Sequence, residues 1–234
     1  MTYTVIIPAA GQGKRMKAGK NKQFLQLNDR PVIIHTLQVF ERDPMCKQVI
    51  VVANHQEITQ MEALFQQYAL KKVDKVIEGG AERQESVFEG IKAVDDREGM
   101  VIIHDGARPF IEVEQIHELL THVTAEQGAV LGTPVTDTIK RVDEHRNIVE
   151  TVPRKPLVAV QTPQAFTYPM IYEAYQNAFT SQFVGTDDTS LVEYMGKEVT
   201  VVFGSEDNIK LTTPFDLAVA NVILRQRQGR GDSE

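Results

Sequence analysis

Residues 5–16 read Val-Ile-Ile-Pro-Ala-Ala-Gly-Gln-Gly-Lys-Arg-Met, and this stretch decides how the rest of the chain is interpreted. A β-branched apolar run stops at a proline and opens into a loop of small residues, which predicts a buried strand leading into a tight turn. Before the first acidic residue, Asp29, the chain carries the basic residues Lys14, Arg15, Lys17, Lys20 and Lys22. Converging backbone N–H groups flanked by Lys and Arg favour a phosphate-binding loop. The alternative is a tight turn with solvated lysines, since runs of charge are usually exposed.

Two familiar phosphate-binding motifs are excluded by the residues after Gly13. The dinucleotide fingerprint requires a third glycine three residues later, where the helix packs on the strand, and Met16 occupies that position. A Walker loop requires Gly-Lys followed by Ser or Thr, and Arg15 follows Gly13-Lys14 here. The sequence therefore predicts a phosphate loop of a different class.

Composition and charge limit the class of protein. With 234 residues the chain is long enough for one large α/β domain, and its net charge of −7 argues against general nucleic-acid binding. The single Cys46 excludes an internal disulfide and indicates a reducing compartment. No signal peptide is recognisable, and no apolar run approaches the ~20 residues that a membrane span requires. We therefore expect a soluble cytoplasmic protein that binds neither nucleic acid nor membranes.

Short β-branched runs alternate with longer amphipathic segments along the chain. The predicted strands cover residues 4–9, 48–53, 72–77, 100–104, 129–133, 158–161 (followed by an irregular turn at 162–164) and 198–203. The predicted helices cover residues 32–41, 58–68, 83–94, 113–127, 169–178, 187–195 and a segment from Pro214 onward. This alternation predicts an α/β, Rossmann-like, mostly parallel sheet covered by helices on both faces. Ligands gather beyond the carboxyl ends of such strands, so the loops at 11–22, 79–86 and 105–108 are expected to share one cleft.

Residues 134–156 interrupt this alternation. Residues 136–142 and 147–152 read as two alternating strands joined by a short turn. A two-stranded hairpin is marginal alone in water, so we expect this segment to be a protruding arm that mediates homodimerisation. Residues 1–225 would form a single domain that includes the arm, followed by a polar, disordered tail over 226–234.

Asp105 follows a predicted strand and is expected in the cleft, opposite the basic loop. A carboxylate that faces a triphosphate most simply holds Mg²⁺, which bridges phosphate oxygens; capping of a loop or helix is the alternative. Asp207 also follows a predicted strand, and it could be either a second metal ligand or a capping residue. His104 has no other His or Cys spaced with it for a transition-metal site, so we interpret it as structural.

A set of short motifs occurs together in one order. They are Pro-Ala-Ala-Gly-x-Gly-x-Arg-Met at 8–16 with Lys22-Gln23, Gly-Gly-x-x-Arg-x-x-Ser-Val at 79–87, His-Asp-x-Ala-Arg-Pro at 104–109, Asp-Thr-Ile-Lys at 137–140, Thr-Pro-Gln at 162–164, and Asp-Asn-Ile-Lys at 207–210. Over about residues 3–225 the chain thereby resembles the 2-C-methyl-D-erythritol 4-phosphate cytidylyltransferases of the non-mevalonate isoprenoid pathway. The resemblance implies a nucleotidyltransferase fold and a transferase that uses CTP and Mg²⁺.

The resemblance also implies a role for individual residues. The sugar phosphate attacks the α-phosphorus of CTP, pyrophosphate leaves, and the catalytic residues that stabilise the α-phosphate are Arg15 and Lys22. The nucleotide-binding residues are Ala9, Ala10, Gly11 and Gly13 at the triphosphate, with Gly80 and Ser86 at the cytosine. The residues at methylerythritol phosphate, some of them reaching across the dimer, are Asp105, Arg108, Thr138, Arg154 and Lys210, and Asp105 also binds Mg²⁺. Many relatives carry an acidic residue after the Gly-Gly pair, and Ala81 here leaves the recognition of cytosine open.

The residue types fit this chemistry even when the resemblance to the family is set aside. The attacking phosphate is ionised at neutral pH, so the reaction needs alignment and charge neutralisation rather than a general base, which suits a site rich in Arg, Lys and Asp and poor in His. Two alternatives stay open: a ribitol 5-phosphate cytidylyltransferase with the same fold, and a non-catalytic nucleotide-binding regulator. Preferential use of ribitol phosphate would favour the first, and tight CTP binding without turnover would favour the second.

Overall fold

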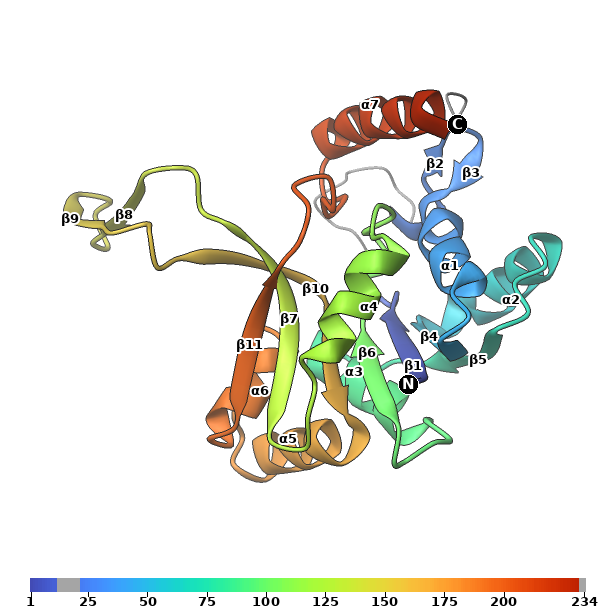
Figure 1. Cartoon of the computed structure of the whole chain (residues 1–234), viewed down its shortest axis with the longest axis horizontal. Coiled ribbons are helices and arrows are strands. Elements are labelled where there is room, and N and C mark those ends of the chain that lie inside the picture. Colours follow the sequence, from blue (N-terminus) through green and yellow to red (C-terminus); the bar gives the residue numbers. More distant parts are fainter. Residues whose placement is uncertain (12–21, 232–234) are drawn as a thin grey trace.

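The structure is a computed structural model, and it describes residues 1–11 and 22–231 (Figure 1). Two predicted site residues, Gly13 and Arg15, lie outside the described residues, as do the side chains of Lys22 and of residues 229–231. The described part of the chain forms one large sheet with helices on both sides, an arm that extends to one side, and a C-terminal helix.

The large sheet has seven strands within the described residues, in the order β11-β7-β10-β6-β1-β4-β5. These strands are β1 (Tyr3–Pro8), β4 (Cys46–Ala53), β5 (Val73–Glu78), β6 (Met100–Ile103), β7 (Gln127–Pro134), β10 (Val158–Thr167) and β11 (Glu198–Phe203). Neighbouring strands are parallel except at β10, which runs antiparallel to both β6 and β7. The prediction of a mostly parallel sheet in an α/β fold is confirmed.

Helices cover both faces of the sheet because the buried strands are apolar on both sides. In β1, Val5 and Ile7 belong to one apolar cluster and Ile6 to the other. The first face is covered by α1 (Val32–Arg42), α2 (Ile58–Gln67) and α4 (Val113–Thr121), and the second by α3 (Arg83–Lys92), α5 (Tyr168–Thr180) and α6 (Asp188–Tyr194). In the described ranges, no helix is long and apolar enough to cross a membrane.

A third apolar cluster lies where the C-terminal helix α7 (Pro214–Gly231) packs on the short strands β2 (Gln26–Leu27) and β3 (Arg30–Pro31). Short 3₁₀ helices occupy Lys22–Phe24 and His55–Glu57. Leu27, Phe110 and Leu211 are buried in this cluster, so segments from the beginning, the middle and the end of the chain meet there. This packing brings the segment before α7 to the same end of the sheet as the loop after β1.

The arm consists of β8 (Ile139–Val142) and β9 (Ile148–Val152), an antiparallel pair that extends away from the sheet (Figure 1). The predicted hairpin is therefore confirmed. Its apolar side chains face solvent, since Val142 is 51% exposed, Ile148 65% and Val149 61%. A hairpin of this kind has no apolar core of its own.

Two predicted boundaries inside the sheet are wrong. The helix predicted over 113–127 ends at Thr121, because the N–H of Thr124 donates to the carbonyl of Gln127 (2.9 Å) in a turn and Gln127 then starts β7. The turn predicted at 162–164 lies inside β10, which passes through a bulge and then pairs with β6 from Gln164 to Thr167. In both places pairing within the sheet overrides the local preference.

The predicted disorder of the tail is also wrong for its first part, since α7 continues to Gly231. Arg227 holds this part of the helix to the body of the protein. Its Nη2 donates to the Phe110 carbonyl at 3.0 Å and lies 2.9 Å from the carboxylate of Glu112. The guanidinium carbon also lies 5.3 Å from the centre of the Phe110 ring. A specific tertiary anchor therefore orders a segment whose composition is polar.

Candidate active site

A cavity of about 320 Å³ opens beyond the carboxyl ends of β1, β5 and β6. Its described lining comprises Pro8 at the end of β1, Ala10 and Gly11 after it, Gln23, residues 80–83 and Ser86 after β5, Asp105 after β6, and Lys210 after β11. The described residues of the three loops that were expected to share one cleft, namely Gly11, residues 80–83 with Ser86, and Asp105, therefore line the same cavity.

The turn between β5 and α3 forms one wall of the cavity. A Cβ at Gly80 would overlap the Cβ of Glu85, so glycine is required where α3 folds back over the turn. Glu82 and Glu85 cap the helix reciprocally, and Glu85 Oε2 also accepts the N–H of Ala81 at 2.7 Å. The N-terminus of a helix of 10 residues, with its partial positive charge, consequently lies at the cavity.

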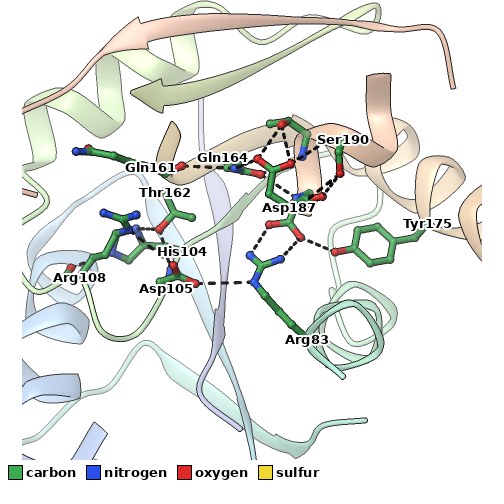
Figure 2. Close-up of polar contacts among 12 residues, drawn as sticks. Arg83, His104, Asp105, Arg108, Gln161, Thr162, Gln164, Tyr175, Asp187 and Ser190 are labelled. Carbon is green, nitrogen blue, oxygen red and sulfur yellow. Dashed lines mark hydrogen bonds and ion pairs between the residues drawn. The ribbon is translucent and has the colours of Figure 1, made fainter. Parts of the chain in front are cut away.

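Asp105 is surrounded by three basic side chains, of which Figure 2 labels Arg83 and Arg108. Its Oδ2 is 2.6 Å from Nζ of Lys210 and 3.7 Å from Nε of Arg108, and its Oδ1 is 3.9 Å from Nε of Arg83. Burial would raise the pKa of this carboxyl, but Lys210, Arg83 and Arg108 outweigh burial and hold the pKa well below its usual value. Asp105 is therefore ionised at neutral pH.

A chain of hydrogen bonds fixes the turn that carries Asp105 (Figure 2). The Asp105 N–H donates to Thr162 Oγ1 at 2.9 Å, and this hydroxyl lies 3.2 Å from His104 Nδ1. His104 Nε2 lies 3.0 Å from the Arg108 carbonyl, which only accepts, so the proton is on Nε2 and the Thr162 hydroxyl donates to Nδ1. Burial lowers the pKa of His104 to about 4, so the imidazole is neutral at pH 7. These contacts agree with the structural interpretation of His104.

Arg83 lines the cavity, although no role was predicted for it from the sequence. Its guanidinium forms a bidentate pair with the buried Asp188, with Nη1–Oδ1 at 2.9 Å and Nη2–Oδ2 at 2.7 Å. Asp188 also accepts the Tyr175 hydroxyl at 2.5 Å, and its N–H donates to Gln164 Oε1 at 3.1 Å. The signal was present, because Arg83 belongs to the Gly-Gly-x-x-Arg-x-x-Ser-Val motif, but its partner is 105 residues away in the sequence.

Three other predicted residues lie in or against the wall of the cavity. Ala9 is buried, and its N–H donates to a carbonyl of β4 at 2.7 Å. Ser86 is buried at the start of α3, with Oγ 3.0 Å from the carbonyl of Glu82. Arg108 Nη1 donates to the carbonyl of Asn208 at 2.7 Å, which joins the loop after β6 to the segment before α7. Together with the lining residues, they place most of the predicted nucleotide site at one end of the sheet.

Three predicted residues are not brought to the cavity. Thr138 and Arg154 belong to the arm, where Arg154 Nη1 donates to the carbonyl of Thr136. The side chain of Asp207 is 44% exposed, and its carboxylate lies 4.0 Å from Nη2 of Arg227. Thr138, Arg154 and Asp207 are absent from the described lining of the cavity.

The donor set at Asp105 fits a magnesium ion that is shared with phosphates. Mg²⁺ is usually bound by one or two carboxylates, with substrate phosphates and water completing its coordination. Asp105 provides one such carboxylate on the cavity wall. Within residues 1–11 and 22–231, no group of three or more His, Cys, Asp or Glu side chains could hold a metal by itself. The position of Asp207 does not support its predicted role as a second ligand.

Comparison with protein families gives one match over nearly the whole chain. The model of the family described as IspD, 2-C-methyl-D-erythritol 4-phosphate cytidylyltransferase, matches residues 3–226. The 2-C-methyl-D-erythritol 4-phosphate cytidylyltransferase of Halalkalibacterium halodurans is 53% identical over 230 residues, which are 98% of this chain and 100% of the relative. That of Bacillus cytotoxicus is 53% identical over 95% of this chain and 97% of its own length.

Solved structures give the same result. The crystal structure of 4-diphosphocytidyl-2C-methyl-D-erythritol synthase from Anaerococcus prevotii matches with a TM-score of 0.83 at 30% identity, over 96% of both chains. The 2-C-methyl-D-erythritol 4-phosphate cytidylyltransferase of Thermus thermophilus matches with a TM-score of 0.79 at 31% identity, over 96% of this chain and 100% of the other. The similarity therefore extends over the arm as well as the sheet.

Proposed function

This chain belongs to the family of 2-C-methyl-D-erythritol 4-phosphate cytidylyltransferases, and we propose that its reaction takes place in the cavity around Asp105. The enzyme joins CTP and 2-C-methyl-D-erythritol 4-phosphate to give 4-diphosphocytidyl-2-C-methyl-D-erythritol and pyrophosphate. The observation that carries the location is the convergence of three loops and three cations, Arg83, Arg108 and Lys210, at one carboxylate.

The reaction requires charge neutralisation more than proton transfer. An oxygen of the sugar phosphate forms a bond to the α-phosphorus of CTP, while the bond from that phosphorus to the bridging oxygen of pyrophosphate breaks. A phosphate monoester has a second pKa of about 6, so the attacking oxygen already carries negative charge at pH 7. No side chain has to remove a proton, and the neutral His104 is not needed as a base. Alignment and stabilisation of the anionic transition state remain as the tasks of the protein.

Backbone and cationic groups divide these tasks. Ala10 and Gly11, with Gly13 from the segment outside the described residues, would place N–H groups around the triphosphate. At the nucleobase we assign Gly80 and Ser86, because the turn before α3 forms the adjacent wall. Arg15 and Lys22 remain our proposal for the groups that stabilise the α-phosphate.

The acceptor phosphate is assigned to the cations that surround Asp105. Lys210 reaches the cavity directly, and Arg108 lies beside it with a side chain that is only 12% exposed. Asp105 would hold Mg²⁺ together with the phosphates, and the ion would neutralise part of their charge when bound. Three cations thus gather around one carboxylate in a protein whose net charge is −7, and such a local group of positive charges would attract an anionic substrate.

A homodimer would complete the acceptor site. Thr138 and Arg154 are on the arm and do not line the cavity of their own chain in the described residues. The exposed apolar residues of β8 and β9 need a covering surface, and a second copy of the chain would supply one. We propose that each arm packs on the partner and presents Thr138 and Arg154 to the partner's cavity. The composition remains in keeping with a cytoplasmic enzyme that has no nucleic-acid or membrane partner.

The function is tested by incubating the purified protein with CTP and Mg²⁺ and each polyol phosphate in turn. We expect pyrophosphate release with methylerythritol phosphate and the corresponding cytidine diphosphate alcohol as product. Preferential use of ribitol 5-phosphate would contradict the acceptor assignment. Tight binding of CTP without turnover on either acceptor would contradict the enzymatic function.

A further inference from the structure

We propose that Asp105 determines which anions the cavity accepts, because its carboxylate occupies the cations that would otherwise bind any free phosphate. On this proposal, phosphate groups bind tightly only together with a divalent cation that takes over Asp105. The inference deepens the proposed function and rests on it for the identity of the anion. It makes Asp105 a specificity-determining residue in addition to a metal ligand.

The contacts of Lys210 and Arg108 carry this inference. Within the described residues, Asp105 is the sole carboxylate paired with Lys210, at 2.6 Å. It is likewise the sole carboxylate paired with Arg108, whose other described partner is the carbonyl of Asn208. A free phosphate must therefore compete with Asp105 for both side chains, and Asp105 is already in place.

Arg83 differs from these two cations because its charge is balanced elsewhere. Asp188 holds its guanidinium in a bidentate pair, and Asp105 is only a more distant neighbour at 3.9 Å. The cluster thus combines three positive charges with two negative ones, a net charge of +1. Replacing Asp105 with asparagine would raise this net charge by one and leave Lys210 and Arg108 without a carboxylate among the described residues.

A divalent cation reverses the effect of Asp105. When the carboxylate binds such an ion, its charge is neutralised and Lys210 and Arg108 are released to bind phosphate oxygens. Binding of the cation and binding of the anion then favour each other, and this coupling must be reciprocal. The cavity would discriminate against free phosphate and pyrophosphate and in favour of phosphates that arrive with a divalent ion.

The decisive experiment measures binding of inorganic pyrophosphate by calorimetry in EDTA, without any nucleotide. The protein is compared with Asp105→Asn, which keeps the side-chain shape, and with Asp207→Asn, which removes the same charge outside the cavity. We expect Asp105→Asn to bind metal-free pyrophosphate at least tenfold more tightly than the unaltered protein, and Asp207→Asn to bind it equally. With Mg²⁺ present, the affinity of the unaltered protein should rise, and that of Asp105→Asn should rise less.

Two results would overturn the inference. One is an affinity of Asp105→Asn for metal-free pyrophosphate within twofold of that of the unaltered protein. The other is an equal gain in Asp207→Asn, which would assign the effect to overall charge. Asp105→Ala serves as a second variant if the asparagine variant fails to fold, as judged by circular dichroism. Because the readout is binding and not turnover, a protein that lacks cytidylyltransferase activity but shows the expected gain would contradict only the proposed function.

Discussion

Asp43 and Asp105 are both acidic residues with little exposure, and they lie at opposite ends of the sheet. Asp43 lies at the amino ends of β1 and β4 and is fully buried. It accepts the Tyr3 hydroxyl at 2.6 Å and the Met45 N–H at 2.9 Å, and His117 Nε2 lies 2.9 Å away. Tyr3 lies in β1, His117 in α4 and Met45 in the turn before β4, so the carboxylate is enclosed by hydrogen bonds from three fixed segments.

Asp105 lies at the carboxyl ends of the strands, and its side-chain partners are charged. Lys210, Arg108 and Arg83 surround it at the wall of a cavity, on side chains that reach it from three different segments. A ligand can take over these partners, which is not possible at Asp43. We infer from this comparison that Asp43, enclosed by hydrogen bonds, stabilises the fold, and we propose that Asp105, balanced by exchangeable cations, serves binding and catalysis.

The largest expected effect is on activity, at the Asp105 end. Lys210→Met should lower turnover by about 10²–10³-fold, by analogy with the loss of one preorganised donor to a transition-state charge. Pyrophosphate release at saturating CTP and Mg²⁺ measures this effect. Lys197→Met is the matched control, because Lys197 pairs with Glu126 and does not line the cavity. Near-normal turnover in Lys210→Met would contradict the proposal that the residues around Asp105 serve catalysis.

Asp188 is intermediate between Asp43 and Asp105. It is as buried as Asp43, but it is hydrogen-bonded to Arg83, which lines the cavity. Asp188→Ala leaves the guanidinium of Arg83 and the hydroxyl of Tyr175 without their partner, so the free energy of unfolding should fall by about 3 kcal/mol. Urea denaturation measures the loss. Activity of the folded fraction should also fall, because Arg83 would no longer be held at the cavity. A loss of stability with unchanged turnover would show that Asp188, like Asp43, stabilises the fold without contributing to activity.

His104, next to Asp105, should make the stability of the protein depend on pH. Its pKa is lowered by burial to about 4 in the folded protein, against about 6.5 in an unfolded chain. The unfolded state therefore binds more protons between these values, and the contribution of His104 to stability, complete above pH 6.5, is lost as the pH falls toward 4. The full difference is about 3 kcal/mol.

This pH dependence is measured by urea denaturation at a series of pH values. His104→Gln should flatten the slope between pH 6.5 and 4. His145→Gln is the control, because that side chain is 77% exposed and should leave the slope unchanged. An equal slope in His104→Gln and the unaltered protein would contradict the assignment of a neutral, buried imidazole.

The smallest expected effect is at Asp43. Asp43→Ala leaves the Tyr3 hydroxyl and the Met45 N–H without their acceptor, which should cost about 2 kcal/mol of stability. Turnover of the folded protein should remain within twofold of normal. Thermal or urea unfolding and pyrophosphate release give the two readouts. A tenfold loss of turnover in well-folded Asp43→Ala would show that the two ends of the sheet are not separate in function.

Local patterns predict much of this architecture. The β-branched runs at 4–9, 48–53 and 100–104 are strands because they have no polar face to expose, and they gave the order of alternation correctly. The convergence of the loops after β1, β5 and β6 followed from the general rule for parallel sheets. Asp105 was identified because it directly follows one of the predicted strands.

Long-range contacts could not be predicted in this way. Arg83 pairs with Asp188, and Asp105 with Lys210, each across 105 positions of sequence, and no periodicity relates such residues. The antiparallel course of β10 through Thr162 was missed because its local residues favour a turn. Asp207 follows a strand as Asp105 does, yet the chain turns it toward Arg227. Position at a strand end is therefore a sign of a site only when the neighbouring strands bring partners to it.

The crowding at Gly80 has a practical consequence for inhibitor design. A side chain of any size at this position would overlap Glu85, whose carboxylate holds the Ala81 N–H in place. An inhibitor that contacts the backbone of this turn would be hard to escape by mutation. A substitution of Gly80 that blocked the inhibitor would also disrupt the turn that the enzyme itself needs.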